Sequence, residues 1–396
     1  MKILIVGAGM YVTGRDNSGT GTILASILQS SKKTKISEVL IVARNPDNRI
    51  AVREARERLN GILGTQVPVE YLPLRENSYE HFSELLAREF DCCIISTPDH
   101  LHFEYAKLAM QAACPTLVVK PLVPTAEENV RLIELQDRYR TYGAVEFHKR
   151  WDETNLYIKR QLSDGYYGRP LYMVVEYSQR ISIPTETFSS WVQKTNIFQY
   201  LGVHYVDMAY FLTGYRPLRL TAYGTRGTLA ERGIADYDSV HVSLVWQNPA
   251  QTGQEFLTNF NTNWIDPEST TAMSDQKYFL VGTEGRIDCN QKNRGLEEVT
   301  RVGGAKSINP YFSDFLPYEE GVRFVGYGHK SIKSFLLDVA GLNSGKRTVA
   351  QLEKIRPTFR SSLVSSAVVE AVNQSLKNSS SWTPVELDWT LVSPST

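Results

Sequence analysis

The chain opens with MKILIVGAG, and this stretch limits the possible folds more than any other part of the sequence. Its apolar run is short and passes directly into a glycine turn, without the cleavage-type region that a signal peptide carries. We therefore expect a strand that is buried on both faces, the kind of strand that parallel sheets contain.

The same rhythm continues as far as Arg150. β-Branched runs alternate with longer amphipathic stretches, which is the pattern of βαβ units. The strand-like runs are KILIVGAG, EVLIVARN, VPVEYLP, DCCIISTP, PTLVVKP and GAVEFHKR. Helices are expected over residues 22–29, 48–63, 79–89, 102–113 and 125–142. Residues 1–150 are thus predicted to form an α/β domain with a doubly wound parallel sheet, a Rossmann dinucleotide-binding fold.

Beyond Arg150 the strand-like runs become longer and alternate polar with apolar residues, as in PLYMVVEYSQR, SVHVSLVW and EFLTNFNTNW. A period of two predicts antiparallel strands with one face exposed or covered by helices. Helical segments are expected over residues 198–212, 330–342 and 350–376. Because 396 residues exceed what one core usually holds, we predict a second domain of the α+β class at 151–396.

Charge and cysteine content argue against several classes of partner. The 43 basic and 43 acidic residues balance, which gives no reason to expect nucleic acid or an anionic membrane. No run reaches the roughly 20 apolar residues of a membrane span. Four cysteines in so long a chain do not make a disulfide scaffold, and they favour a reducing cytoplasm.

The turn after the first strand reads GAGMYV at residues 7–12. In a dinucleotide site the first glycine permits the tight turn, and the second lets the backbone approach a pyrophosphate. Valine stands at the third glycine position, and residues 13–21 read as an insertion that delays the next helix. That insertion either adds phosphate contacts or is simply mobile. The residues of this turn that are predicted to bind the cofactor are Gly7, Gly9, Met10 and Tyr11.

The second strand ends at Arg44 and Asn45, where a protein specific for NAD usually places an acidic residue on the ribose hydroxyls. A guanidinium pairs with a 2′-phosphate in a forked geometry and stacks on adenine, so Arg44 favours NADP over NAD. The alternatives are that Arg44 is a solvated surface residue and that Asn45 only caps the next helix.

Three later motifs resemble the Gfo/Idh/MocA oxidoreductase family. They are STPDHLH at 96–102, VKP at 119–121 and GVHYVD at 202–207, and the resemblance extends over nearly the whole chain. It implies a second domain with a large open, mainly antiparallel sheet and a closing pair of helices near 331–341 and 355–376. In the family the first motif lines the cofactor, which implies that role for Thr97, Pro98 and His102, with Asp99 where asparagine is common.

The lysine of the family's Glu-Lys-Pro motif lies beside the nicotinamide. The resemblance therefore implies that Lys120 is catalytic and that Pro121 adjoins the cofactor, although valine replaces the glutamate here. Oxidation of an alcohol needs a group that takes the hydroxyl proton while hydride leaves the carbon, and a nearby cation polarises the oxygen. A lysine at a strand end can serve both needs; the alternative is an ordinary surface charge.

His204 resembles the family histidine that exchanges a proton with the substrate hydroxyl, and imidazole titrates near neutral pH. Many members carry an aspartate one helical turn earlier, where this chain has Tyr200. A phenol is a weaker base, with an ordinary pKa of about 10. Either Tyr200 gives a hydrogen bond to substrate, or the acid–base groups are reduced to Lys120 and His204. In the alternative structural role, His204 only packs and pairs with Asp207.

Further residues are predicted to line the substrate site: Arg150, Trp191, Asn196, Gln199 and Asp207. Arg150 resembles the family's arginine at the start of the second domain, where it either touches substrate or holds the interface. Aromatic faces and planar hydrogen-bonding groups suit a polyol, with a structural role as the alternative for Trp191, Asn196 and Gln199. No metal site is expected.

We therefore expect an NAD(P)-dependent oxidoreductase, with NADP favoured, that moves hydride to or from a secondary hydroxyl or ketone. Its small-molecule substrate would be a sugar, cyclitol, sugar acid or nucleotide sugar. The alternative is a catalytically silent NAD(P)-binding regulatory protein, although a pure binder has no need of both Lys120 and His204. The resemblance also implies a homodimer or homotetramer formed through the open sheet.

Overall fold

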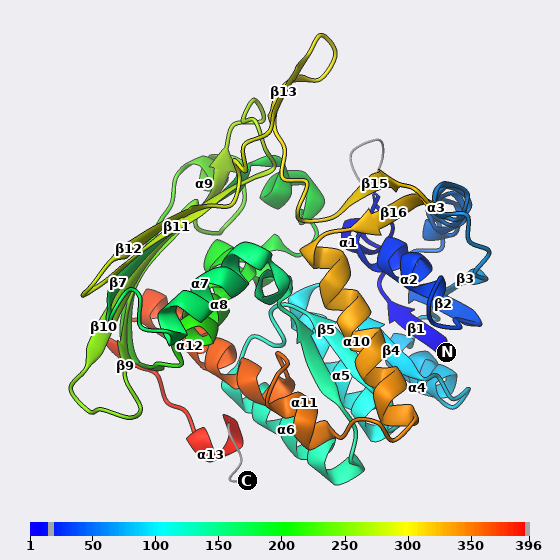
Figure 1. Ribbon diagram of the computed structural model, residues 1–396, viewed down its shortest axis with the longest axis horizontal. Helices are drawn as coiled ribbons and strands as arrows, with labels where there is room; N and C mark the ends of the chain where they lie inside the picture. The colour runs from blue at the N-terminus through cyan, green and yellow to red at the C-terminus, as the bar shows by residue number, and fades with distance from the viewer. Residues whose placement is uncertain (15–19, 393–396) are drawn as a thin grey trace.

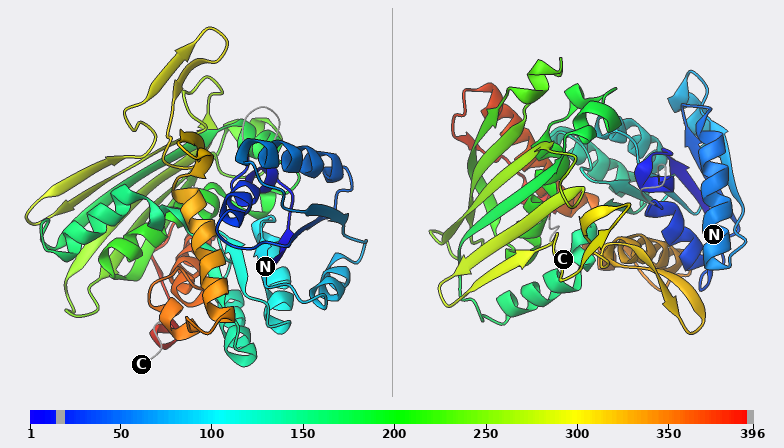
Figure 2. Two further views of the ribbon diagram at one scale, coloured as in Figure 1. Left: turned by 45° about the vertical axis from the view of Figure 1, so that its right-hand side comes forward. Right: turned by 90° about the horizontal axis from the view of Figure 1, so that it is seen from above.

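The computed structural model describes residues 1–14 and 20–392 and is drawn in Figure 1. Two β-sheets stand side by side, with helices between them and on the outer side of one (Figures 1 and 2). Over the described ranges, none of the helices has both the length and the apolar character needed to cross a bilayer.

The first sheet has six parallel strands in the order β3-β2-β1-β4-β5-β6. The strands are β1 (Lys2–Val6), β2 (Glu38–Ala43), β3 (Val69–Pro73), β4 (Cys92–Ile95), β5 (Thr116–Val119) and β6 (Gly143–Glu146). The helices are α1 (Met10–Thr13), α2 (Ile23–Ser31), α3 (Asn48–Leu63), α4 (Ser78–Leu86), α5 (His102–Gln111) and α6 (Ala126–Tyr139). This order confirms the predicted doubly wound Rossmann fold, in which the strand order reverses between β1 and β4.

The predicted insertion after the glycine turn includes residues 15–19, which lie outside the described residues. Its two ends meet, because a Cβ added to Gly21 would lie 2.6 Å from the backbone nitrogen of Gly14. The Thr22 amide also donates to the Tyr11 carbonyl at 2.8 Å, so α1 and α2 remain linked across the insertion.

The second sheet has seven strands in the order β12-β11-β7-β10-β9-β8-β17. Its strands are β7 (Pro170–Arg180), β8 (Arg216–Thr225), β9 (Ser239–Gln247), β10 (Glu255–Asp266), β11 (Ser274–Gly282), β12 (Arg286–Asn290) and β17 (Thr383–Pro384). The β7–β10 pair is parallel and the other pairs are antiparallel. The predicted mainly antiparallel sheet is thus confirmed.

Helices cover the face of this sheet that looks toward the parallel sheet, as Figures 1 and 2 show. They are α7 (Glu153–Ser163), α8 (Val203–Thr213) and α12 (Phe359–Lys377). Short helical turns lie elsewhere along the chain, η2 (Asp99–Leu101) after β4, η3 (His148–Trp151) after β6, and η4 (Ile183–Thr187), η5 (Val192–Lys194) and η6 (Phe198–Gly202) between β7 and α8. The helix predicted at 198–212 begins as the wider π-type turn η6 before α8. The helix predicted at 350–376 is divided at Pro357, which cannot continue a helix, into α11 (Val349–Glu353) and α12.

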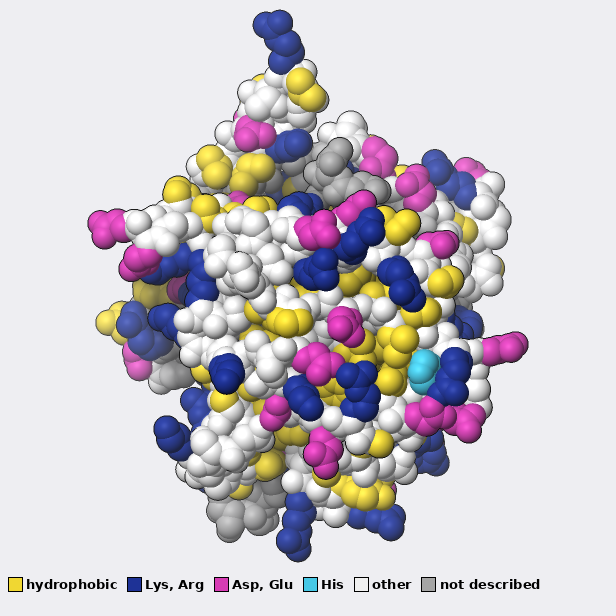
Figure 3. Space-filling model, turned by 90° about the vertical axis from the view of Figure 1, so that its right-hand side faces the viewer, with side chains coloured by type: hydrophobic (Ala, Val, Ile, Leu, Met, Phe, Trp, Pro, Cys, Tyr) yellow, Lys and Arg dark blue, Asp and Glu magenta, His cyan; other side chains and the backbone are white. Residues whose placement is uncertain are grey.

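Two β-hairpins that the sequence patterns did not predict precede α10 (Tyr327–Asn343). The hairpin of β13 (Glu297–Thr300) and β14 (Gly304–Ser307) projects from the body of the protein (Figures 1 and 3). The hairpin of β15 (Asp314–Tyr318) and β16 (Gly321–Val325) lies against α2 and α3, where the Phe324 amide donates to Gln29 Oε1 at 3.0 Å. The shorter helices are α9 (Thr228–Glu231) and α13 (Trp389–Val392).

The carboxyl-terminal helices return to the first sheet. Helix α10 packs on α2 and α12 packs on α6, and the Val145 amide of β6 donates to the Pro357 carbonyl at 2.8 Å. These late segments support the parallel sheet, so the division of the chain at residue 150 stays a prediction.

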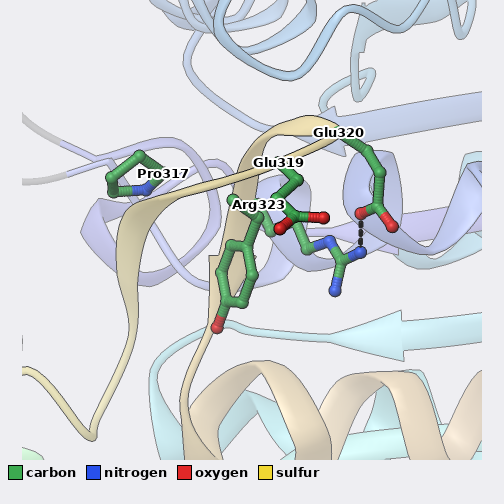
Figure 4. A pocket seen from close by; sticks show the side chains of 5 residues that line it. Pro317, Glu319, Glu320 and Arg323 are labelled. Atoms are coloured by element: carbon green, nitrogen blue, oxygen red, sulfur yellow. Dashed lines mark hydrogen bonds and ion pairs between the residues drawn. The ribbon is translucent and has the colours of Figure 1, made fainter.

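The surface of the molecule is mixed in charge on the face that Figure 3 shows, where basic and acidic side chains intersperse. A shallow hollow lies at the turn between β15 and β16, and Figure 4 shows that Glu320 and Arg323 pair there. The other residues that line it are Pro317, Tyr318 and Glu319. Because it lies at an exposed turn and its one basic side chain is already paired with Glu320, we assign no role to this hollow.

Candidate active site

The carboxyl ends of β1, β4, β5 and β6 bring most of the predicted residues to one edge of the parallel sheet. In doubly wound folds ligands bind outside this edge, where the strand order reverses. The second domain reaches the same place, because Lys120 after β5 donates from Nζ to the carbonyl oxygen of Tyr200 in η6 at 2.5 Å. The edge is therefore a junction between the sheet and the helix that carries His204.

The glycine turn has the shape that a dinucleotide site needs. Gly7 has a φ of +106°, and a Cβ there would lie 2.0 Å from the Ser96 carbonyl oxygen, so only glycine fits. A Cβ on Gly9 would meet nothing within 4 Å, which leaves the backbone open to a ligand. Val12, at the third glycine position, is buried in the core beneath the turn and does not block that opening.

The side chain of Lys120 is enclosed by Tyr200. Besides the hydrogen bond to the Tyr200 carbonyl, its Nζ lies 3.9 Å from the centre of the Tyr200 ring. Burial lowers the pKa of Lys120 to about 7, whereas the carboxylates of Glu146 and Asp99 act to raise it. Near neutral pH the amine is therefore neutral in part of the molecules, in which state it can accept a proton.

Tyr200 supports the lysine through its carbonyl and its ring face. Its ring packs edge-on against Phe188, with the ring centres 4.8 Å apart. Burial raises the pKa of Tyr200 above its ordinary value, so the hydroxyl stays protonated at neutral pH. The predicted role of Tyr200 in acid–base chemistry stays a prediction, and the packing favours a supporting role.

His204 is buried on α8, and its Nδ1 has no hydrogen-bond partner among the described residues. Burial lowers the pKa of His204 well below its ordinary value, and the nearby charges of Lys120, His148 and Lys149 lower it further. The imidazole is therefore neutral at pH 7. It does not pair with Asp207, which was the alternative considered from the sequence.

Asp207 instead accepts two hydrogen bonds from the Arg150 guanidinium, at 2.9 and 2.6 Å. Both side chains are largely buried, and burial raises the pKa of Asp207 while Arg150 acts to lower it. The pair fastens η3 to α8 at the start of the second domain. Each of these charged groups already has the other as its hydrogen-bond partner. A contact of Arg150 or Asp207 with substrate stays a prediction.

His102 joins the turns that follow β4 and β5. Its buried ring contacts the Thr97 carbonyl oxygen and the Pro121 carbonyl oxygen, each at 2.8 Å. The Lys120–Pro121 bond is cis. Pro98 and Thr97 form the first of these turns, and Thr97 Oγ1 is buried without a partner among the described residues. His102 therefore holds the turns in place, and contact of Thr97, Pro98 and Pro121 with a cofactor stays a prediction.

Three predicted substrate residues lie on the segment before α8, where they also make structural contacts. Gln199 Nε2 donates to Asp99 Oδ2 at 2.7 Å, which ties η6 to the turn after β4. Asn196 accepts from the Gln199 amide at 2.9 Å and donates to Asn373 Oδ1 at 2.8 Å. The Trp191 ring lies 4.2 Å from that of Phe188, centre to centre. The structural alternative accounts for the observed contacts, and substrate contact by these residues stays a prediction.

At the end of β2, Arg44 is exposed and donates to Ser78 Oγ from Nε at 3.3 Å and from Nη2 at 3.1 Å. Asn45 Oδ1 accepts from the Asp47 amide at 2.9 Å, and the residue before α3 is Asp47. Asn45 is therefore part of the turn that leads into α3 without being its cap residue. Binding of a phosphate by Arg44 and contact of Asn45 with the cofactor stay predictions.

Sequence reasoning missed three residues of the site, because it treated GAVEFHKR as a strand and took only Arg150 from it. Glu146 ends β6 and lies beside His148, whose ring is 4.8 Å from that of His204. Lys149 is buried behind these residues and donates to Gln291 Oε1 at 2.9 Å. The signal that was available is an acidic residue at the end of a buried parallel strand.

The edge fits a nicotinamide dinucleotide on its own geometry. Thr97 Oγ1, Glu146 Oε1 and His204 Nδ1 are buried without a hydrogen-bond partner among the described residues. Buried polar atoms are nearly always paired, so this set indicates a place where a ligand or water completes the bonding. The open backbone at Gly9 and Lys120, which directly follows β5, lie along the same edge.

Comparison with known proteins agrees with this geometry. Residues 1–147 match the family described as "Oxidoreductase family, NAD-binding Rossmann fold", and residues 155–288 match the "GFO/IDH/MocA C-terminal domain". The inositol 2-dehydrogenase of Rhizobium meliloti is 25% identical over 294 residues, which are 73% of this chain and 79% of that protein. The NADP-linked scyllo-inositol 2-dehydrogenase IolW of Bacillus subtilis is 30% identical over 156 residues, which are 38% of this chain and 41% of that protein.

A solved structure shows the same fold. The scyllo-inositol dehydrogenase of Lactobacillus casei, with bound NAD(H) and scyllo-inositol, superposes with a TM-score of 0.65 at 14% identity. The superposition covers 97% of this chain and 98% of that one.

Proposed function

The chain belongs to the GFO/IDH/MocA oxidoreductase family, whose amino-terminal domain binds a nicotinamide cofactor, and from this premise we propose that it is a cyclitol or sugar dehydrogenase. The reaction would interconvert a secondary hydroxyl and a ketone. Inositol dehydrogenases among the relatives support the cyclitol class, and a levoglucosan dehydrogenase and a D-xylose 1-dehydrogenase support sugars as the wider class.

The observation that carries the proposal is the proximity of Lys120 and His204 at the ligand-binding edge, where the charge of Lys120 acts on the imidazole. Burial brings the pKa of Lys120 to about 7 and lowers that of His204, so both groups are available as proton acceptors near neutral pH. A protonated Lys120 also places a positive charge where an alkoxide would develop. The nicotinamide, when bound, supplies the hydride acceptor.

Each side chain then has a definite task. The glycine turn at Gly7 and Gly9 accommodates the pyrophosphate, and Lys120 takes the hydroxyl proton or returns it in the reverse direction. His204 orients the hydroxyl and shares the proton with Lys120. Tyr200 holds the lysine side chain in place through its carbonyl and ring.

The direct test is a screen of myo-inositol, scyllo-inositol, D-xylose and D-glucose with NADP⁺ and NAD⁺, followed at the absorbance of the reduced nicotinamide. Turnover of at least one polyol is expected, together with its loss in Lys120→Met. Lys107→Met is the matched control, because Lys107 forms a surface ion pair with Glu104. Cofactor binding without turnover of any polyol would favour the silent regulatory protein instead.

We infer that the cofactor is NADP, because Arg44 stands exposed at the end of β2 with no acidic residue beside it. Its guanidinium can turn from Ser78 toward a 2′-phosphate. Arg44→Asp is expected to weaken NADPH binding by about tenfold, which is the size of one lost charged contact, and to leave NADH binding unchanged or improved. Arg131→Asp, which breaks a surface pair with Glu127, is the control.

We also propose that the chain forms a homodimer or homotetramer through the outer face of the seven-stranded sheet. That face carries exposed apolar side chains on β7 and β8, including Tyr172 and Tyr223. Light scattering after gel filtration should give a multiple of the 44.8 kDa chain mass. Tyr172→Glu should reduce that multiple, whereas a single-chain mass for the unmodified protein would end the proposal.

A further inference from the structure

A carboxylate and an imidazole with no task in the reaction described above lie together beside His204. Glu146 is the last residue of β6 and His148 is the first residue of η3, and their exposed fractions are only 1% and 9%. Burial of a carboxylate or an imidazole costs free energy unless the group has a hydrogen-bonded or charged partner. Glu146 and His148 are paired with each other.

The contact between them fixes the state of the imidazole. His148 Nδ1 lies 2.9 Å from Glu146 Oε2, and since a carboxylate can only accept, the Nδ1–H donates. This bond leaves Nε2 of His148 with its lone pair free to take a proton, as in other carboxylate–histidine pairs. The second oxygen, Glu146 Oε1, is buried without a partner among the described residues, and the Tyr11 hydroxyl is 3.5 Å from His148 Nδ1.

The ring of His148 is held on several sides. It stacks on Tyr327 with ring centres 5.6 Å apart and planes 25° apart, and Phe312 meets it edge-on at 5.2 Å. Its other neighbour is the His204 ring, whose centre is 4.8 Å away. The aromatic rings limit its rotation, so the imidazole stays beside His204.

His204 needs a neighbouring group that can take a proton from it. The helical position one turn before it holds Tyr200, and burial raises the pKa of that phenol, so no carboxylate stabilises a protonated His204 from its own helix. Burial and the neighbouring cations also disfavour the protonated form of His204. A proton that arrives at His204 therefore has a strong tendency to move on.

We propose that His148 accepts the reaction's proton from His204 and that Glu146 is a positioning residue that acts through His148, so that the two hold the proton as an imidazolium–carboxylate pair. In the oxidation direction the substrate O–H bond breaks, and its proton, shared by Lys120 and His204 as proposed above, passes from His204 to Nε2 of His148. The electron pair of that O–H bond stays on oxygen to form the ketone, and hydride leaves to the acceptor that a bound nicotinamide would supply. In reduction the proton returns by the same path. This inference rests on the proposed dehydrogenase function and deepens it.

The charged and titratable groups around His148 come from every element packed on it. They are Tyr11 of α1, Glu146 of β6, His204 of α8 and Tyr327 of α10, with Lys120 and Lys149 close enough to influence Glu146 and His204. Among these groups Lys120, His148 and Lys149 lower the pKa of His204, and Glu146 supplies the negative charge that faces His148.

The test uses the full chain with ¹⁵N-labelled histidine, in the unmodified protein and in Glu146→Gln, His148→Asn and His204→Asn. Each variant is first checked for thermal stability and for NADPH binding by fluorescence, and both should stay close to those of the unmodified protein. His81→Asn is the control, because His81 lies on α4 away from this cluster, where its Nδ1 accepts from the Arg75 amide at 3.0 Å.

The ¹⁵N shifts of neutral His148 should show the Nδ1–H tautomer, which is the less common one in free histidine, and Glu146→Gln should weaken that preference, because an amide can either accept from Nδ1–H or donate to Nδ1. His204 should titrate at higher pH in His148→Asn, because a neighbouring positive charge is removed. A neutral His148 that carries its proton on Nε2 in the unmodified protein would overturn the inference.

The kinetic arm uses myo-inositol and NADP⁺ as the probe pair. Glu146→Gln and His148→Asn should each lower kcat about 10- to 100-fold, while KM changes less than about threefold. The acidic limb of the pH profile should shift to lower pH in Glu146→Gln, which loses a negative charge, and to higher pH in His148→Asn, in which His204 titrates at higher pH. An unchanged pH profile in both variants overturns the inference even when kcat falls. Failure of the unmodified protein to oxidise any polyol counts against the proposed function, and the tautomer measurement then decides the role of the pair by itself.

Discussion

Two lysines, Lys120 and Lys149, lower the pKa of His204, and they differ in how many hydrogen-bond partners surround them. Lys120, at the edge of the parallel sheet, has one carbonyl and one ring as partners, and Glu146 Oε1 and His204 Nδ1 are buried there without a hydrogen-bond partner among the described residues. Lys149 lies one layer behind, where its Nζ donates to Gln276 Oε1 and to Gln291 Oε1 and rests 4.9 Å from the centre of the Tyr205 ring.

Several further side chains belong to the hydrogen-bond network around Lys149. Gln291 continues it by donating to Asp152 Oδ2 at 3.2 Å, and Arg294 pairs with the same carboxylate. Burial lowers the pKa of Lys149 to about 7, the same direction and value as for Lys120. The two lysines therefore share the lowered pKa and differ in the hydrogen bonds that surround them. A shifted pKa alone does not identify a catalytic lysine; unpaired neighbours at a ligand-binding edge do.

The largest expected effect separates the two lysines in catalysis. Lys120→Met should lower kcat for an oxidised polyol by about 10³-fold, because it removes both the proton acceptor and the positive charge beside the developing oxyanion. Lys149→Met should lower it less than about tenfold. Steady-state kinetics at pH 7.5 measure both, and equal losses in the two variants would erase the distinction.

The next largest effect is on stability, where the substitution of Lys149 should cost more than that of Lys120. Lys149→Met removes the ammonium donor of Gln276 Oε1 and leaves that oxygen only a long contact with the Tyr205 hydroxyl at 3.4 Å, so the free energy of unfolding should fall by about 1–3 kcal/mol. Lys120→Met should change it by less than about 1 kcal/mol, because it removes few bonds. Urea unfolding monitored by tryptophan fluorescence gives both values. A gain in stability for Lys149→Met would mean that the cost of burying its ammonium outweighs the network.

A smaller effect is shared by both lysines and appears in the pH dependence of stability. Their pKa values in the folded chain are about 7, below the value of about 10.4 for an unfolded chain, so the unfolded state binds more protons between these limits. The free energy of unfolding should therefore rise with pH from about 7 to 10 and level off above. Each single Met variant should reduce the slope, as urea titrations at several pH values would show; an unchanged slope in both variants would contradict it.

The smallest effect concerns Tyr200. Tyr200→Phe keeps the backbone carbonyl and the ring face that contact Lys120, so kcat should change less than about threefold. Tyr200→Leu removes the ring and should cost about tenfold, the size of a buried cation–π contact. A large loss in Tyr200→Phe would instead show that the hydroxyl takes part in the chemistry, as the sequence had suggested.

The parallel sheet could be predicted from the sequence because its information is local. Each strand is a short apolar run, the glycine turn follows the first of them, and α3 has the predicted bounds of residues 48–63. The β13–β14 hairpin could not be predicted, since EEVT and GAKS are exposed, polar and without alternation.

The candidate site was predicted in part. Lys120 and His204 were named from motifs. The structure places Lys120 against η6 and His204 on α8, the helix that follows η6. The partners of the remaining residues depend on contacts between distant parts of the chain, such as Arg150 with Asp207 and Gln199 with Asp99. A charged residue read by itself gives no sign of whether its partner is substrate or another side chain, which is why these roles could not be settled from sequence.

The most direct test of the account is a fluorescence titration of the purified chain with NADPH and, separately, with NADH. We predict saturable binding of both, with NADPH the tighter ligand, and binding that persists in Lys120→Met although turnover is lost. Binding of neither nucleotide would show that the edge of the parallel sheet with its unpaired atoms is not a cofactor site, and the central claim would be wrong.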